Sequence, residues 1–264
     1  MKTLSITLSV SCLLALPCSA ATLASDSAAD SVYSDGWDNG DNGGSGWGGG
    51  WILSGVGGFS GHFIGSSTAN GDGDGNSDGD IDTSGRSWGQ FAHTSNTSGA
   101  IRPFSGSLTT GQTVEVGFDN GFIQNGGAVG IALQNSSGEN LVEFLFVGGS
   151  TSGYTVNAGS YTGTTPGFTD EGMTLAITQT AANAFGLSVN TLNPAASFGG
   201  TGTYYSPSGG QEVTQLRLFN FNSASSGGQP AFDSFANSIA IVPEPSIALL
   251  GSVGILALLR RRRI

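Results

Sequence analysis

Residues 113–118 read TVEVGF, and this short alternation is the strongest indication of the fold. In an extended chain successive side chains point to opposite faces, so Val114, Val116 and Phe118 share one face. The polar or small residues between them share the other face. A strand with one apolar and one polar face is typical of a sheet that covers a hydrophobic core on one side.

Eight further runs of this kind lie between residues 87 and 242. They are SWGQFAH, AIRPF, AVGIAL, LVEFLF, MTLAIT, FGLSVNTL, QLRLFNF and SIAIV. Each is short, rich in strand-forming side chains and bounded by Gly, Asn, Asp or Ser, and no segment has a capped helical period of ten or more residues. We therefore predict an all-β protein, an antiparallel β-sandwich of the jelly-roll type. MTLAIT and FGLSVNTL, joined by QTAANA, are expected to form a hairpin.

The region before these runs is rich in glycine and aspartate. From Gly36 to Asp80, 17 of 45 residues are glycine. We expect residues 21–86 to form long loops and the first strands of the sandwich, and residues 87–242 to form the sandwich itself. A largely disordered Gly/Ser chain would fit residues 36–80 but not the patterned region that follows.

The N-terminal residues 1–20 have the layout of a secretory signal peptide. One cation, Lys2, precedes an apolar run from Leu8 to Leu16, and small residues follow it. We predict a signal helix that signal peptidase removes near Ala20. A lipoprotein signal ending at Cys18 fits less well, because a proline precedes that cysteine where such signals carry a small residue.

The C-terminal residues 242–264 read VPEPSIALLGSVGILALLRRRRI. The apolar stretch Ser246–Leu259 has 14 residues, which as a helix would span roughly 21 Å against about 30 Å of hydrocarbon. The arginines after it are expected to stay in the cytoplasm by the positive-inside rule. This apolar helix would be a marginal membrane anchor.

A proline-glutamate-proline motif, an apolar segment and an arginine cluster stand in this order at the end of the chain. Together they resemble the PEP-CTERM sorting signal of Gram-negative bacteria, over residues 243–264. The residues that carry the resemblance are Pro243, Glu244, Pro245, Arg260, Arg261, Arg262 and Arg263. The resemblance implies recognition by an exosortase, cleavage near the motif, transit through the inner membrane and delivery to the cell surface or the extracellular matrix. The alternative is an ordinary single-span anchor.

Processing at both ends would change the charge of the chain. Only Arg86, Arg102 and Arg217 remain of the basic residues, against eighteen acidic ones, which gives a formal charge of −15. Such a surface repels nucleic acid and anionic lipid, so we expect no nucleic-acid partner. Both cysteines, Cys12 and Cys18, lie in the signal peptide, so disulfide and thiolate chemistry are excluded from the mature chain.

A second resemblance is based on the rhythm of the strands. SWGQFA, AIRPFSGSLTTGQTVEVGFDNGF, AVGIALQNSSGENLVEFLFVGG and the closing QLRLFNF and SIAIV resemble concanavalin A-like sandwich modules of secreted bacterial proteins. The resemblance covers residues 87–242. It implies a sheet that could bind carbohydrate, and an extracellular polysaccharide is the expected partner.

The stretch NGDGDGNSDGDIDTSG, residues 70–85, is a candidate calcium site. Its possible ligands are Asp72, Asp74, Asn76, Asp78, Asp80 and Asp82. Oxygen side chains at alternate positions of a tight loop suit Ca²⁺, and Gly79 falls where an EF-hand-type loop turns sharply. The match ends at Gly85, where such loops carry a bidentate glutamate. The alternative is a solvated Asp-Gly loop.

Trp37, Trp47 and Trp51 raise a further question within the glycine-rich region. Their aromatic faces could form a platform on which sugars stack. Tryptophans in such loops more often fold back onto the core, and we favour that interpretation.

Motifs for catalysis are sparse. His62 and His93 lack the spacing of a zinc protease, and the sequence has no GxSxG motif. Glu115, Glu139 and Glu143 could supply paired carboxylates, but the ExDxxE strand of laminarinase-like enzymes is absent. We therefore predict a protein that is not an enzyme, with a structural, adhesive or carbohydrate-binding role at the surface. The alternative is a secreted polysaccharide-active enzyme.

Overall fold

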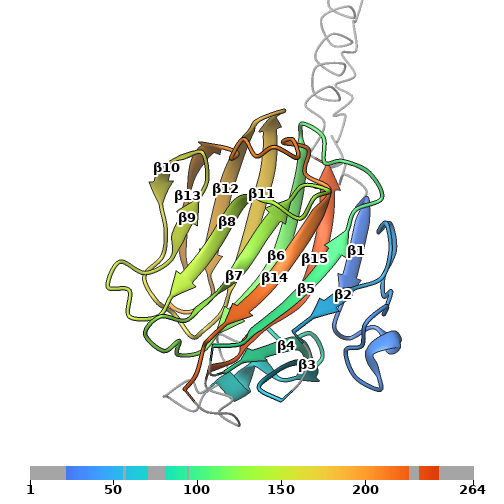
Figure 1. Ribbon diagram of the computed structural model, residues 1–264, viewed down its shortest axis with the longest axis vertical. Coiled ribbons are helices and arrows are strands. Elements are labelled where there is room, and N and C mark those ends of the chain that lie inside the picture. The colour runs from blue at the N-terminus through green and yellow to red at the C-terminus, as the bar shows by residue number, and fades with distance from the viewer. Residues whose placement is uncertain (1–21, 56–57, 71–80, 94, 226–231, 244–264) are drawn as a thin grey trace, which may run out of the picture. The chain divides into compact units, whose positions relative to one another are not determined.

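The computed structural model describes residues 22–55, 58–70, 81–93, 95–225 and 232–243. Two sheets are stacked as a β-sandwich, with the six-stranded sheet in front of the larger one in Figure 1. Every ladder between neighbouring strands is antiparallel. The predicted fold class, an antiparallel β-sandwich of the jelly-roll type, is confirmed.

The larger sheet has nine strands. Its main path runs β10 (Ser160–Thr164), β13 (Ala196–Thr203), β12 (Ala184–Thr191), β11 (Met173–Ala181), β6 (Gln112–Asn120), β15 (Ser234–Pro243), β4 (Ser87–Ala92) and β3 (Ser60–Gly65). The ninth strand, β1 (Ala24–Ser27), pairs with β15 off this path.

The smaller sheet has six strands. In order they are β2 (Ile52–Ser54), β5 (Thr97–Pro103), β14 (Gln215–Phe221), β7 (Ala128–Gln134), β8 (Asn140–Val147) and β9 (Thr155–Asn157). Two short 3₁₀ helices, η1 (Ser31–Tyr33) and η2 (Ser67–Asn70), lie in the N-terminal part of the described chain.

The core fills the space between the two sheets. The alternation predicted from TVEVGF is confirmed. Val114, Val116 and Phe118 are buried in this core, and Glu115 is exposed. Many of the core side chains are aromatic. Those that are fully buried include Tyr33, Trp51, Trp88, Phe144, Tyr154 and Phe185. Complete burial of one large apolar side chain contributes about 1.5–3 kcal/mol, so this set accounts for much of the stability of the sandwich.

Each of the nine runs chosen from the sequence lies on a strand to within one residue at its end, and the predicted hairpin is formed by β11 and β12. The strands that the sequence did not indicate are the short or glycine-rich ones. β13, for example, reads ASFGGTGT and has only one large apolar side chain, Phe198. It is a strand because both of its edges are paired, with β12 on one side and β10 on the other.

Glycine in the N-terminal region permits close contact between segments. Gly44 has φ +65°, and a Cβ on it would lie 1.7 Å from the backbone oxygen of Ser25. Next to Gly44, the backbone N–H of Ser25 donates to the Ser45 oxygen at 3.0 Å, and the backbone N–H of Ser45 donates to the Ser25 oxygen at 2.9 Å. The segment therefore lies directly on β1, and a side chain at residue 44 would separate the two.

The two terminal segments carry the predicted sorting signals. Residues 1–20, predicted as a signal peptide, and the C-terminal apolar stretch Ser246–Leu259 lie outside the described residues. Within the described part of the chain, no helix is long and apolar enough to cross a membrane.

Candidate functional site

A groove crosses the outer face of the nine-stranded sheet. It has a volume of ≈ 300 Å³ and spans the four neighbouring strands β12, β11, β6 and β15. Its lining is Glu115, Val116, Gly117, Thr174, Leu175, Ala176, Asn190, Ser238, Ile239 and Ala240. Val116, Leu175 and Ile239 point into the core, so the remaining residues, apart from Gly117, present their side chains to the groove.

Strand register sets the order of these outward side chains. Thr174 of β11 lies opposite Asn190 on one neighbour and opposite Gly117 on the other. One step along, Glu115 of β6 lies opposite Ala176 and Ala240. Small residues therefore form the floor of the groove, while hydroxyl, amide and carboxylate groups stand along it.

A β-bulge shapes the β15 side of the groove. The register of β15 against β6 shifts between Ala236 and Ile239. The side chain of Asn237 in this bulge lies over Gly117, where a Cβ would be 1.9 Å from the Asn237 Oδ1. Asn237 Nδ2 donates to Thr83 Oγ1 at 2.8 Å, and Ser238 Oγ donates to Asn237 Oδ1 at 3.1 Å. Bulges commonly re-aim side chains in this way beside functional sites.

The chemistry of the lining suits a hydroxyl-rich ligand. The Glu115 carboxylate accepts hydrogen bonds, and the hydroxyl and amide groups of Thr174, Ser238 and Asn190 both donate and accept them. Glu115, Thr174 and Asn190 are exposed. No cation lies among the lining residues, so an anionic ligand has no counter-charge there.

The three glutamates considered as catalytic groups are not brought together. Glu143 lies on β8 in the other sheet, where it accepts hydrogen bonds from Asn140 Nδ2 at 2.5 Å and Asn157 Nδ2 at 3.2 Å. Glu139 precedes β8, and hydrogen bonds from Asn135 Nδ2 and the backbone N–H of Gly209 lower its pKa. Glu115 is therefore the single carboxylate of the groove lining.

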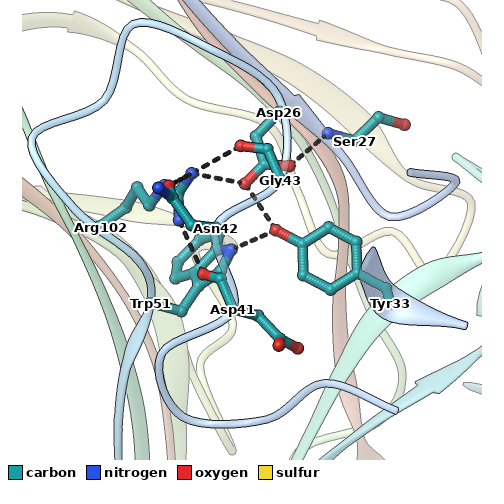
Figure 2. A network of polar contacts seen from close by, with 8 residues as sticks. All are labelled: Asp26, Ser27, Tyr33, Asp41, Asn42, Gly43, Trp51 and Arg102. Atoms are coloured by element: carbon teal, nitrogen blue, oxygen red, sulfur yellow. Dashed lines mark hydrogen bonds and ion pairs between the residues drawn. The ribbon is translucent and has the colours of Figure 1, made fainter. Parts of the chain in front are cut away.

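A second polar cluster has a buried ion pair at its centre, and Figure 2 shows its members. Arg102 Nη2 lies 3.1 Å from Asp26 Oδ2, and neither side chain is exposed. The Tyr33 hydroxyl donates to the same carboxylate at 2.6 Å, and Trp51 Nε1 donates to the Tyr33 oxygen at 2.9 Å. The guanidinium also donates to the backbone oxygens of Asp41 and Gly43 and to Asn42 Oδ1.

This cluster stabilises the attachment of residues 26–51 to β5. Burial raises the pKa of Asp26 to about 6, and the Tyr33 hydrogen bond and the Arg102 charge oppose that rise. The guanidinium carbon also lies 5.3 Å from the centre of the Trp47 ring and 5.5 Å from that of Trp51. All of these partners are supplied by the protein, so the cluster is structural.

The tryptophans of the glycine-rich region do not form an exposed platform. Trp37 and Trp51 are 2% and 1% exposed and belong to the main core cluster. Trp47 packs against the same cluster. The sugar-stacking platform is therefore wrong, and the favoured interpretation, that these rings fold onto the core, is confirmed.

Of the proposed calcium ligands, only Asp82 lies within the described residues. Its carboxylate accepts hydrogen bonds from Ser66 Oγ at 2.5 Å and from the backbone N–H of Ser67 at 2.8 Å. Asp72, Asp74, Asn76, Asp78 and Asp80 lie outside the described residues. Among the residues that the structure does describe, no three His, Cys, Asp or Glu side chains are placed to hold a metal ion. The calcium site stays a prediction.

Of the sorting residues, Pro243 alone is described. It is the last residue of β15 and lies opposite Gln112 of β6. Glu244, Pro245 and the arginines at 260–263 lie outside the described residues.

Comparison with known proteins assigns no family. No protein-family model matches the chain, and no curated protein matches it significantly. Among solved structures, a carbohydrate esterase from the Shiga toxin-encoding bacteriophage phi24B is 14% identical, with 85% of this chain and 99% of that chain covered and a TM-score of 0.45. Lectin II from Ulex europaeus is 10% identical over 62% of this chain and 89% of the lectin, with a TM-score of 0.39.

A β-glucanase from Bacillus licheniformis is likewise 10% identical, over 60% of this chain and 79% of that chain, with a TM-score of 0.35. At such identities the likeness concerns the fold alone. It nevertheless corrects the prediction that the protein is not an enzyme, because similar structures include enzymes as well as lectins. Sandwiches of this type support both catalysis and binding, so the sparse catalytic motifs do not exclude activity.

Proposed function

We propose that this chain is an exported protein of the cell surface or extracellular matrix that engages polysaccharide along the groove of its nine-stranded sheet. The groove itself carries the proposal. It is open along the sheet, has a floor of small side chains, and presents Glu115, Thr174, Asn190 and Ser238 to a ligand. Hydroxyl groups of a glycan can pair with each of these side chains.

The proposed route to the surface is supported by the two ends of the sequence. Signal peptidase would remove residues 1–20, and an exosortase would act near Pro243-Glu244-Pro245 after the C-terminal segment has entered the inner membrane. The acidic mature chain suits a soluble role outside the cell.

A substitution that fills the groove tests the proposal. Ala176→Trp places a large ring on the groove floor without changing the inward face of β11. We expect the variant to lose at least tenfold in affinity for the polysaccharides that a glycan array identifies for the unchanged protein, because the ring occupies the ligand's place.

Ala184→Trp is the matched control. Ala184 is also an outward alanine of the same sheet, on β12, but it does not line the groove. It should bind as the unchanged protein does. Equal losses in the two variants, or no glycan binding by the unchanged protein, would contradict the proposal.

A second candidate function, a polysaccharide-active enzyme, is favoured by the position of Glu115. An exposed carboxylate in a glycan groove can serve as a general acid or base. The usual glycosidase needs two carboxyl groups, so this activity requires a second group outside the described lining or one on the substrate. Release of reducing ends from a bound polysaccharide, lost in Glu115→Gln while binding persists, would establish the enzyme.

A further inference from the structure

A second pocket lies between residues 33–38 and the edge strand β3. Its volume is ≈ 540 Å³, within the ~300–1,000 Å³ usual for small-molecule sites. Residues 33–38 form one wall, and His62, Phe63, Ile64 and Arg86 form the other. None of these residues lines the groove, so the two sites are built from different side chains.

The wall formed by residues 33–38 is fixed by its own hydrogen bonds. The backbone N–H of Asp38 donates to Asp41 Oδ2 at 2.8 Å, and that of Gly40 donates to the Trp51 oxygen at 2.8 Å. Tyr33 is held by the buried cluster of Figure 2. A wall ordered before binding lowers the entropy cost of holding a small ligand.

His62 supplies an acceptor. Its Nε2 lies 3.1 Å from the Gly99 oxygen and 3.0 Å from Ser98 Oγ, whose proton is donated to the Gly61 oxygen. Both neighbours therefore accept, so Nε2 carries the hydrogen. Burial lowers the pKa of His62 to about 4, which keeps the ring neutral at pH 7. Its Nδ1 is then a bare acceptor, and it has no hydrogen-bond partner among the described residues.

Trp37 and Arg86 supply donors. Trp37 Nε1 and Arg86 Nε are buried and have no partner in the described part of the chain. Arg86 Nη2 donates to the backbone oxygen of Tyr33, and no described acidic group lies within ion-pair distance of this guanidinium. Unmatched buried donors and acceptors are uncommon in native proteins, and an ordered water or ion is one reason for them. Each of these atoms is buried, so all of them lie behind the pocket surface rather than on it.

The charges of the pocket select the kind of ligand. Asp35 and Asp38 are exposed and disfavour an anion. Arg86 in the opposite wall disfavours an organic cation. Exposed carboxylate acceptors beside the partly exposed ring of Phe63 instead suit a neutral ring that carries many hydroxyl groups.

We propose that this pocket binds a single neutral sugar residue. The carboxylates of Asp35 and Asp38 accept hydrogen bonds from its hydroxyl groups, and an apolar face of the sugar ring packs against Phe63. This site does not depend on the groove, and its test is independent of the function proposed for the groove.

The indole N–H resonance of Trp37 reports on the pocket directly. The chain contains four tryptophans, and Trp37→Phe assigns this resonance in a ¹⁵N-labelled sample. The probes are methyl glycosides of glucose, galactose, mannose and N-acetylglucosamine, each added at millimolar concentration, with glucuronate and choline as charged competitors. We expect a saturable shift of the Trp37 resonance with at least one neutral glycoside.

Three variants complete the test. Asp38→Asn should weaken the binding about tenfold, as expected when a hydrogen bond to a charged group is lost. Asp30→Asn, a carboxylate outside the pocket lining, and the groove variant Ala176→Trp should leave the shift unchanged. The resonance of the Trp47 indole N–H, a buried atom of a partly buried ring away from the pocket lining, should not move.

Three results would overturn the proposal. They are no saturable shift with any neutral glycoside, a larger response to choline or glucuronate, and equal affinity in Asp38→Asn and the unchanged protein. Loss of glycan binding at the groove with a retained Trp37 shift would instead count against the groove alone.

Discussion

Asp233 is a buried carboxyl group whose proton affinity differs between the folded and unfolded chain. Burial raises its pKa from 3.8 to about 8. Its neighbour His93, with Nε2 3.8 Å from Asp233 Oδ1, has a lowered pKa for the same reason. Both groups are therefore mostly neutral at pH 7, and the contact is not an ion pair at that pH.

The raised pKa of Asp233 predicts a loss of stability as pH rises. The folded protein keeps this proton up to about pH 8, whereas the unfolded chain releases it near 3.8, so the free energy of unfolding falls through that window. Between about pH 7 and 8 the histidines are largely neutral in both states, because their pKa is near 6.5 in the unfolded chain and lower in the folded one. There we expect a fall of up to about 1.4 kcal/mol per pH unit in denaturant titrations. Asp233→Asn should remove this slope, and an unchanged slope would contradict the assignment.

At the scale of the elements, the sequence predicted strands wherever apolar residues alternate. Val114, Val116 and Phe118 reveal β6 and also place Glu115 on its outer face. The other residues of the groove were not predicted as a site, because Thr174, Asn190 and Ser238 become neighbours only through the order of β12, β11, β6 and β15. Strand order depends on contacts between distant segments, and no local pattern records it. The bulge at Asn237 likewise depends on its partner strand.

The close contact of Gly44 and Ser45 with β1 gives a prediction at the scale of the elements. Gly44→Ala should destabilise the protein by about 2–4 kcal/mol, because the new Cβ collides with the Ser25 oxygen in addition to the left-handed backbone strain. Gly85→Ala is the matched control, since Gly85 has φ +72° and no atom within 4 Å of an added Cβ. It should cost only about 1–2 kcal/mol. Equal losses in thermal unfolding would rule out the collision.

At the scale of the whole molecule, we propose that an acidic sandwich carries a sorting signal at each end of its sequence. If both signals are processed as proposed, the surface form begins near residue 21 and lacks residues Arg260–Arg263. Intact-mass measurement of the form recovered from the cell surface of a Gram-negative host carrying an exosortase checks this. A surface form that keeps the arginine cluster would instead support an ordinary anchor.

The pairing of β1 with β15 has a topological consequence. Ala24 lies opposite Ile241, and the backbone N–H of Leu23 donates to the Ile241 oxygen at 2.8 Å, so the described chain begins and ends on adjacent strands. A short linker from Pro243 to Thr22 would close the backbone into a ring. The sandwich is thus suited to circular permutation, with new termini in the turn between β11 and β12.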